Sequence, residues 1–275
     1  MKQRSTVLAT LLLFVLSATC LLPGQAPKRD KKRVLAVGMT VGFYHDSTTE
    51  ALVTIDQLGR KSGLWDTYIY TDIEPITKQK LQGNKKNLDD FDAIFFMTTG
   101  ELPFNDEQKA SFLAFIRDEG KGFVGAHCAT DTFYKWPEYG EMLGGYFDHH
   151  PWNTFDAPIV VEDPSHPFVK QFPKEFTLKD EIYQFKDWNR DKMRVLMTLD
   201  ASKLDLTKKN INRADRDFGV SWVKTYGNGR VFYSTLGHTL ESWRDDNVQK
   251  MWLEAMRWAL KLGPDVPTSP ITKKK

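Results

Sequence analysis

Residues 122–152 read GFVGAHCATDTFYKWPEYGEMLGGYFDHHPW, and they indicate more about fold and function than any other stretch of the chain. The apolar run Gly122–Ala126 predicts a buried strand, and the chain turns polar at His127. In an open parallel sheet the carboxyl ends of the strands border the ligand crevice, so side chains that follow such a strand are well placed for chemistry. Aromatic residues surround the imidazoles here, which is typical of a pocket for a polar ring such as a sugar.

Strand and helix patterns alternate through the first half of the chain. The expected strands are the short apolar runs at residues 33–39, 65–70, 90–97 and 122–126. Leu52, Ile55 and Leu58 recur at helical spacing after the first run, and Asp46 or Ser47 is the expected N-cap. Strands joined by helices through short connections form right-handed crossovers. The expected fold class is therefore α/β, a three-layer sandwich with a mostly parallel sheet between two helical layers.

The second half is less regular until about residue 200, and then strand patterns and a final helix pattern follow. The expected strands are residues 158–161, 176–185, 194–199, 220–226 and 230–236. Asn228-Gly229, between the last two, is a strong signal for a hairpin turn. Residues 246–262 have the apolar spacing of an amphipathic helix.

The composition is typical of a globular protein, because 41% of the 275 residues are hydrophobic and 13% are aromatic. Of the 38 basic residues Lys2 and Arg4 belong to the expected leader, so 36 remain to balance the 36 acidic ones. The basic residues are scattered, apart from short runs at 28–33 and 273–275. A nucleic-acid-binding surface needs a concentrated positive face, so no nucleic-acid partner is expected.

The first 26 residues have the pattern of a secretory signal peptide. Lys2 and Arg4 form its charged region, residues 7–16 its apolar region, and small residues precede Cys20. Simple cleavage after this region is expected, and a lipid anchor on Cys20 is the alternative. Either outcome exports the protein to the periplasm or the extracellular space, and no transmembrane span is expected in the mature chain. The expected organisation is a signal peptide at 1–26, a linker at 27–32, a folded domain at 33–263 and a polar tail at 264–275.

Cys128 is the one cysteine outside this leader, so no intrachain disulfide is expected. Successive side chains of a strand point to opposite faces, so His127 and Cys128 should not both face the crevice. We expect His127 in the crevice and Cys128 in the core, which argues against a thiol nucleophile.

Five of the six histidines stand where a predicted strand or loop turns polar. His45 follows the first strand, His127 ends the fourth and His238 follows the last, so a parallel sheet would bring all three to one edge. Imidazole titrates near neutral pH and serves as acid, base or ligand. The alternative is that each ring only hydrogen-bonds loop backbone, which is the role expected for His166 in its proline-bounded turn.

A divalent metal such as zinc is an open alternative for these histidines. Zinc takes three or four His, Cys or carboxylate ligands. The candidate metal ligands are His45, His127 and His150, and Asp131 and Glu181 could complete the set. No pair of histidines has the helical His-x-x-x-His spacing, so the sequence establishes neither this metal nor any other cofactor.

Several separated motifs resemble the ThuA-like family, which is named for trehalose utilisation. They are the stretch at 122–152, EDPSHPF at 162–168, DEIY at 180–183 and WVKTYGNGRVFYSTLGH at 222–238. They occur in the family's order, and the match extends over residues 33–262. The resemblance implies the class I glutamine amidotransferase-like fold, a flavodoxin-like three-layer α/β sandwich.

The amidotransferases of this superfamily carry a cysteine on a tight strand-to-helix turn between glycines. In this chain Gly125-Ala126-His127-Cys128-Ala129 resembles that turn, with His127 in the place of the nucleophile and Ala129 in the place of the second glycine. His238 falls at the position that resembles the amidotransferase histidine. The comparison implies that the crevice is kept and that Cys-dependent glutamine hydrolysis is not.

The resemblance implies a role in disaccharide or keto-sugar metabolism, and we expect an exported hydrolase, lyase or isomerase with a sugar as its small-molecule substrate. His127 would be the central acid or base, His238 its partner, and Asp131 the group that orients an imidazole. The residues expected to bind the sugar are His45, Tyr134, His150, Trp152, Glu181 and Trp243. Among these, Tyr134 and Trp152 would stack on the sugar ring.

Two other functions stay open from the sequence. A non-catalytic carbohydrate-binding or accessory module would keep the crevice without chemistry, and a metal-dependent amidohydrolase would use metal-activated water. Residues 37–42 lack the glycine spacing of a dinucleotide-binding turn. An oxidation step would therefore need a separate sugar oxidoreductase as a partner.

Overall fold

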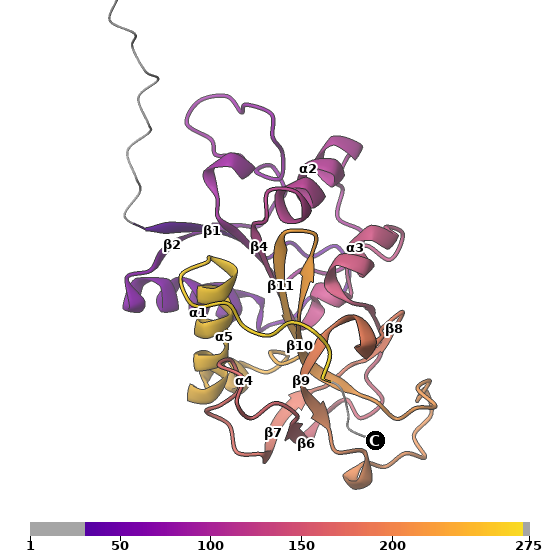
Figure 1. The fold of residues 1–275 in the computed structure, drawn as a ribbon. Coiled ribbons are helices and arrows are strands. Elements are labelled where there is room, and N and C mark those ends of the chain that lie inside the picture. Colours follow the sequence, from indigo (N-terminus) through magenta and orange to yellow (C-terminus); the bar gives the residue numbers. More distant parts are fainter. Residues whose placement is uncertain (1–30, 272–275) are drawn as a thin grey trace, which may run out of the picture. The chain divides into compact units, whose positions relative to one another are not determined.

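The computed structural model describes residues 31–271, and a nine-stranded sheet lies at their centre (Figure 1). The expected signal peptide, with Cys20, and the last four residues of the expected tail lie outside the described residues. Within residues 31–271 no helix is both long enough and apolar enough to cross a membrane.

Five parallel strands form one half of the sheet. In their order across the sheet they are β2 (Trp65–Tyr70), β1 (Lys32–Val37), β3 (Ala93–Phe96), β4 (Gly122–Ala126) and β11 (Gly229–Ser234). This order is that of flavodoxin-like folds, in which ligands bind outside the carboxyl ends of the strands where the strand order reverses. The predicted α/β class with its flavodoxin-like sheet is confirmed.

The other half of the sheet is antiparallel. Beyond β11 lie β10 (Gly219–Tyr226), β9 (Arg194–Leu199), β6 (Thr154–Val161) and β7 (Glu175–Glu181). The predicted hairpin joins β10 to β11, and its register pairs Tyr226 with Gly229 across Asn228. The antiparallel strands extend the sheet past the last parallel strand and carry residues 175–181 toward the ends of β4 and β11.

A separate two-stranded sheet pairs β5 (Tyr146–His149) with β8 (Gln184–Lys186). The single strand predicted over 176–185 is therefore wrong. The chain pairs with β6 up to Glu181 and with β5 from Gln184, so Tyr183 lies in the connection between two different sheets.

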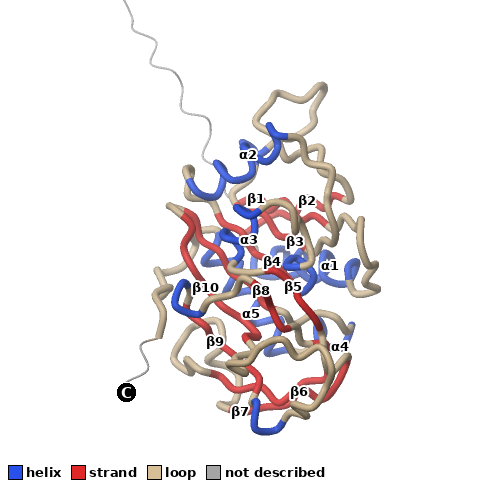
Figure 2. The backbone as a smooth tube through the Cα atoms, turned by 90° about the vertical axis from the view of Figure 1, so that its right-hand side faces the viewer, coloured by secondary structure: helices blue, strands red, loops and turns tan. Residues whose placement is uncertain are grey.

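Helices cover both faces of the large sheet (Figure 1 and Figure 2). One face carries α1 (Thr48–Ser62), α4 (Leu240–Arg244) and α5 (Asp246–Ala259), and the other carries α2 (Asp106–Arg117) and α3 (Pro137–Leu143). Four short 3-10 helices are η1 (Leu88–Asp90), η2 (His127–Thr130), η3 (Arg190–Lys192) and η4 (Ala201–Lys203). These layers produce two hydrophobic cores, one on each side of the sheet.

Strand β1 shows how the sequence divides its side chains between the two cores. Val34 and Ala36 pack in the core under α1 and α5, whereas Leu35 and Val37 pack in the core under α2 and α3. Both faces of the strand are covered, so it has a continuous apolar run instead of an alternating pattern.

The helix starts differ in how they are capped. Asn105 and Gln108 form a reciprocal capping box at the start of α2. Ser47 stands at the N-cap position of α1 as predicted, but its hydroxyl does not cap the helix. It donates instead to the carbonyl oxygen of Gly237 at 2.7 Å. This bond ties the start of α1 to the loop that carries His238.

The loop between β1 and α1 is held by a close backbone approach at Gly100. The amides of Val41 and Gly42 donate to the carbonyl oxygen of Thr99 at 2.9 and 3.3 Å. Gly100 has a φ of 82°, and a Cβ atom there would lie 2.6 Å from the nitrogen of Gly42. This contact leaves no room for a side chain and positions the loop that leads to His45.

The variant Gly100→Ala should lower the free energy of unfolding by about 2–4 kcal/mol, because the left-handed backbone and the steric overlap both oppose a side chain. Gly63→Ala is the matched control. Gly63 has a φ of 71° but nothing within 4 Å of its Cβ position, so only the backbone cost of about 1–2 kcal/mol should appear. Urea unfolding measures the free energy of unfolding of both variants, and an equal decrease in the two would contradict the close approach at Gly100.

Candidate functional site

The loops that follow β1, β4 and β11 bring three imidazoles together at the carboxyl ends of these parallel strands. The ring centroid of His45 lies 4.9 Å from that of His127 and 5.3 Å from that of His238. The centroids of His127 and His238 are 5.2 Å apart. His45 and His127 are buried, and His238 is partly exposed. The three rings therefore meet at one edge of the sheet.

The His127 side chain is oriented by its backbone and by one hydrogen bond. His127 begins η2 directly after β4 and has a φ of 40°, a backbone strain that is typical of functional sites. Its Nδ1 atom lies 2.6 Å from the carbonyl oxygen of Thr235. A carbonyl oxygen only accepts, so Nδ1 carries the proton and Nε2 of the neutral ring is an acceptor. The lone pair of Nε2 thus faces the other members of the group.

Glu181 and Tyr183 join the imidazoles from the end of β7 and the connection that follows. The Tyr183 hydroxyl donates to Nε2 of His127 at 2.7 Å and lies 3.4 Å from Nε2 of His45. Oε1 of Glu181 lies 3.4 Å from Nδ1 of His238 and 3.8 Å from Nε2 of His127. The sequence prediction missed Tyr183. The signal that could have identified Tyr183 is its position two residues after Glu181 in DEIY, because residues two apart in an extended chain share a face.

The carboxylate of Asp180 holds the loop that carries His238. It is fully buried, and it accepts hydrogen bonds from the backbone amides of Gly237 at 2.7 Å, His238 at 3.0 Å and Thr239 at 3.2 Å. Burial raises the pKa of Asp180 to about 6, although these donors favour its charged form. The sequence prediction gave Asp180 no role in placing His238, because these three backbone contacts depend on the tertiary fold.

Burial keeps the imidazoles uncharged. It lowers the pKa of His45 to about 4, with a further contribution from His238, and it lowers the pKa of His127 and His238 as well. Burial also raises the pKa of Glu181 to about 6, and the neighbouring carboxylate of Asp180 acts in the same direction. At neutral pH the group therefore presents three neutral imidazoles and a carboxylate, which are ligands suited to a divalent metal.

Four of these residues could hold a metal ion together. One ligand atom from each of His45, His127, Glu181 and His238 lies within 4.8 Å of the others. Ligands at about 2.1 Å from a tetrahedral metal stand about 3.4 Å apart, so a small inward movement would bring these atoms onto one ion. The inward lone pair on Nε2 of His127 fits this use, because the other ring nitrogen is already bonded to backbone.

His150 lies at the edge of this group. Its Nδ1 atom is 3.5 Å from Oε2 of Glu181 and 3.2 Å from the Asn153 side-chain oxygen, and 38% of its side chain is exposed. The sequence prediction placed His150 with His45 and His127 as a metal ligand. In the structure His238 and Glu181 lie beside those two histidines, and His150 contacts the far oxygen of the carboxylate.

Asp131 and Tyr134 bond to each other instead of to an imidazole. The Tyr134 hydroxyl donates to Oδ1 of Asp131 at 2.5 Å, and burial raises the pKa of Asp131. The Lys186 amine lies 4.5 Å above the Tyr134 ring. The expected role of Asp131 as the group that orients an imidazole therefore has no direct contact to support it within residues 31–271.

The two tryptophans predicted to bind the sugar pack in the core. Trp243 is fully buried, stacks on Trp252 at 5.2 Å and donates from Nε1 to the carbonyl oxygen of Gly237 at 2.8 Å. Trp152 is 9% exposed and packs edge-on against Phe218 at 5.0 Å. A ring that binds a sugar needs an exposed face, so the stacking role predicted for Trp152 and the sugar-binding role predicted for Trp243 are corrected to core packing.

Cys128 also belongs to the core. It is 1% exposed, and burial raises the pKa of its thiol well above the ordinary value. The thiolate is the nucleophilic form of cysteine, so a thiol in this environment is inert. The sulfur of Cys128 packs in the core and the imidazole of His127 joins the histidine group, although both residues lie in η2 and not in the strand from which this separation was predicted.

Comparison with known proteins gives one family match. The family model described as ThuA, trehalose utilisation, matches residues 33–259. A search of curated proteins found no match to the sequence.

Two solved structures of ThuA-like proteins share the fold. The putative ThuA-like protein from Bacteroides uniformis is 22% identical, with a TM-score of 0.68 over 86% of this chain and 95% of that one. The putative ThuA-like protein from Parabacteroides merdae is 19% identical, with a TM-score of 0.64 over 89% of this chain and 93% of that one. A glutamine amidotransferase from Thermotoga maritima is 12% identical, with a TM-score of 0.45 over 85% of this chain and 100% of that one. At such identities the two ThuA-like structures show a common fold.

The variant Asp180→Asn should lower the free energy of unfolding by about 1–3 kcal/mol. The NH2 group of asparagine replaces one carboxylate oxygen and cannot accept a hydrogen bond. Either the buried N–H of Gly237 or those of His238 and Thr239 therefore lose their acceptor. Asp205→Asn is the control, because Asp205 is exposed and caps only the local turn at Thr207. Urea unfolding of both variants gives the comparison, and a loss for Asp180→Asn as small as that of Asp205→Asn would refute the proposed anchoring of the His238 loop.

His166 lies in a proline-bounded turn outside this group and provides a test of burial alone. The ring is buried against Phe168 with centroids 4.6 Å apart. Burial lowers the pKa of His166 to about 4. Its folded-state pKa is below the unfolded value of about 6.5, so its stabilising effect is complete above pH 6.5 and is lost as the pH falls through 4.

Between pH 7 and pH 4 the wild-type chain should therefore lose about 2–3 kcal/mol more stability than the variant His166→Gln. The other titrating groups are common to both proteins and cancel in the difference. Urea unfolding at a series of pH values measures it, and a difference that stays constant over this range would contradict the shifted pKa.

Proposed function

The chain belongs to the ThuA family, described by trehalose utilisation, and we propose that it is an exported, metal-dependent enzyme that acts on a disaccharide or keto-sugar. The reaction would be a hydrolysis, an elimination or an isomerisation. The observation that carries this proposal is the convergence of three neutral imidazoles and a carboxylate on one point at the end of the parallel strands. Such groups are costly to bury, which supports a role in chemistry over a role in packing.

His45, His127 and His238 would hold the metal, and zinc is the ion that suits them best. Catalytic zinc sites use three protein ligands and keep a further position open for substrate. The Thr235 carbonyl fixes the ligand tautomer of His127, as backbone acceptors do for metal-binding histidines. When bound, the ion would act as a Lewis acid toward a carbonyl or hydroxyl oxygen of the sugar.

Glu181 and Tyr183 would move the protons. The pKa of Glu181 near 6 suits a carboxylate that accepts a proton at neutral pH. Burial raises the pKa of Tyr183 well above its ordinary value, so its hydroxyl stays protonated and serves as a donor beside Nε2 of His127. His238 is the partly exposed member of the group and His150 lies at its edge, so a substrate would enter past these two residues.

The proposed sugar substrate and the proposed export are supported by different observations. The family description supports a sugar substrate. The charged and apolar pattern of residues 1–26 supports export. A keto-sugar substrate would come from a separate sugar oxidoreductase, since residues 37–42 lack a dinucleotide-binding turn.

Protein purified without added metal should contain about one divalent ion per chain, measured by inductively coupled plasma mass spectrometry. His238→Ala removes a ligand and should reduce the bound metal to background. His149→Ala is the control, because this neighbour of His150 lies outside the group of four and should leave the metal content unchanged. Wild-type protein with no more metal than His238→Ala, before and after incubation with zinc, would overturn the metal site.

The variant Glu181→Gln tests whether Glu181 is a general base or a metal ligand. It should keep the metal and lose at least about 100-fold in turnover, since a general base contributes about 10²–10⁴-fold. The assay follows trehalose, other disaccharides and their keto derivatives. Loss of the metal in Glu181→Gln would make Glu181 a ligand and contradict its role as base. Binding of these sugars without product over days would instead support a non-catalytic module.

A further inference from the structure

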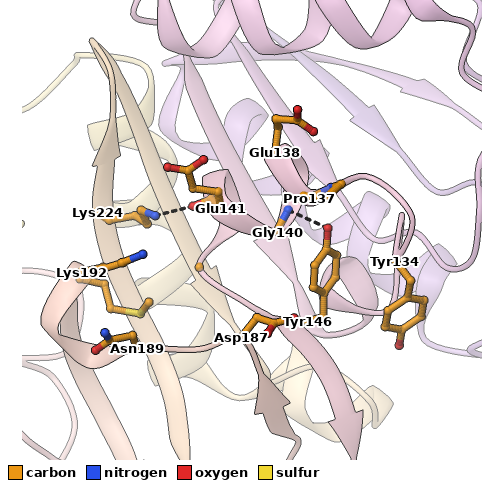
Figure 3. A pocket seen from close by; sticks show the side chains of 12 residues that line it. Tyr134, Pro137, Glu138, Gly140, Glu141, Tyr146, Asp187, Asn189, Lys192 and Lys224 are labelled. Atoms are coloured by element: carbon orange, nitrogen blue, oxygen red, sulfur yellow. Dashed lines mark hydrogen bonds between the residues drawn. The ribbon is translucent and has the colours of Figure 1, made fainter.

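A cavity lined by none of the histidines lies beside α3 (Figure 3). Its volume is about 520 Å³, within the range of small-molecule sites. The walls come from Tyr134, from α3 and Gly144, from Tyr146 of β5, from the segment at 187–193 and from Lys224 of β10. None of these residues takes part in the function proposed above.

Lys224 is the unusual member of this lining. The residue is 6% exposed, and its Nζ atom donates to the backbone carbonyl oxygen of Glu141 at 2.5 Å. Within residues 31–271 it forms no ion pair with a carboxylate at 4 Å or less. A buried ammonium is normally paired, because burial without a counter-charge is costly.

The surroundings of the amine favour its uncharged form. Burial lowers the pKa of Lys224 to about 8; the Glu141 carboxylate opposes this shift and the Lys192 amine adds to it. An ordinary lysine has a pKa of about 10.4, so the fraction of neutral amine at pH 7 is on the order of 100 times larger here. A neutral amine is the nucleophilic form of lysine.

The bond to Glu141 caps the C-terminal end of α3, but capping alone does not explain the position of the amine. A lysine that reached in from solvent would cap these carbonyl groups equally well. Lys224 instead lies in the buried part of β10 and lines the cavity. Figure 3 shows the amine of Lys192 near it on the same side of the cavity.

The rest of the lining suits a small hydroxylated molecule. Tyr146 and Met193 provide apolar surface, and Asp187, Asn189 and Glu138 provide groups that hydrogen-bond hydroxyls. A neutral lysine amine in such a cavity reacts with carbonyl compounds to form a Schiff base.

We propose that Lys224 binds an aldehyde or ketone covalently, with a small hydroxylated carbonyl compound in this cavity as the ligand. Nζ adds to the carbonyl carbon and forms a C–N bond. The carbonyl oxygen leaves as water with the two amine protons, and an imine remains. The Glu141 carboxylate acts on the amine electrostatically without forming an ion pair with it, and solvent water carries these protons. Addition of water reverses the reaction, so no oxidant or reductant is required.

Reductive trapping tests the proposal in the wild-type protein. Glycolaldehyde is the probe, sodium cyanoborohydride reduces any imine to a stable amine, and peptide mass spectrometry locates the product after short incubations at pH 7. Lys224 should be modified at least about tenfold faster than Lys85 and Lys203. These two lysines are exposed, and ion pairs with Glu74 and Glu175 raise their pKa.

The rates of modification of Lys224, Lys85 and Lys203 are compared within one sample of wild-type protein, so the test does not require a variant to fold. Lys224→Met, checked by thermal unfolding, should remove the fast reaction, and Lys192→Met should leave the modification of Lys224 in place. His238→Ala should also leave it in place, which separates this site from the proposed metal site. Modification of Lys224 no faster than that of Lys85 would overturn the proposal, whatever the metal content of the protein.

Discussion

The hydrogen bond from Nδ1 of His127 to the carbonyl oxygen of Thr235 determines what the histidine group can do. It fixes one tautomer, so the lone pair of the ring lies on Nε2, where it accepts the hydrogen bond of Tyr183 and faces His45 and His238. Burial adds the second condition, because it holds the imidazoles in their neutral form. Neutral rings with inward lone pairs attract a cation or a proton donor. Protonated rings in the same place would repel one another.

This arrangement depends on a short loop that several buried groups hold at once. Gly237 has a φ of 126°, its amide donates to Asp180, and its carbonyl oxygen accepts from Ser47 and Trp243. These partners come from the end of β7, the start of α1 and α4. These three elements therefore each contribute one hydrogen bond to Gly237, the residue that precedes His238. The fold positions the site through backbone contacts as much as through the side chains that perform the chemistry.

The sequence predicted those features that follow from local pattern and sheet geometry. Apolar runs located the parallel strands, and the rule that ligands lie at strand carboxyl ends explains why His45, His127 and His238 belong together. The sequence could not predict contacts that arise from packing between distant elements. Trp243 was predicted to bind the sugar, yet it is buried and stacks on Trp252 of α5. Tyr183 was missed because it lies where the chain passes from one sheet to another.

The central claim is that Nε2 of His127 is a metal ligand whose orientation the Thr235 carbonyl imposes. Crystals of the protein soaked in zinc, with anomalous diffraction recorded on both sides of the zinc absorption edge, test it most directly. An anomalous peak should appear about 2.1 Å from Nε2 of His127, with nitrogens of His45 and His238 at similar distances. A density map without that peak, in which the Tyr183 hydroxyl still bonds to Nε2, would contradict it.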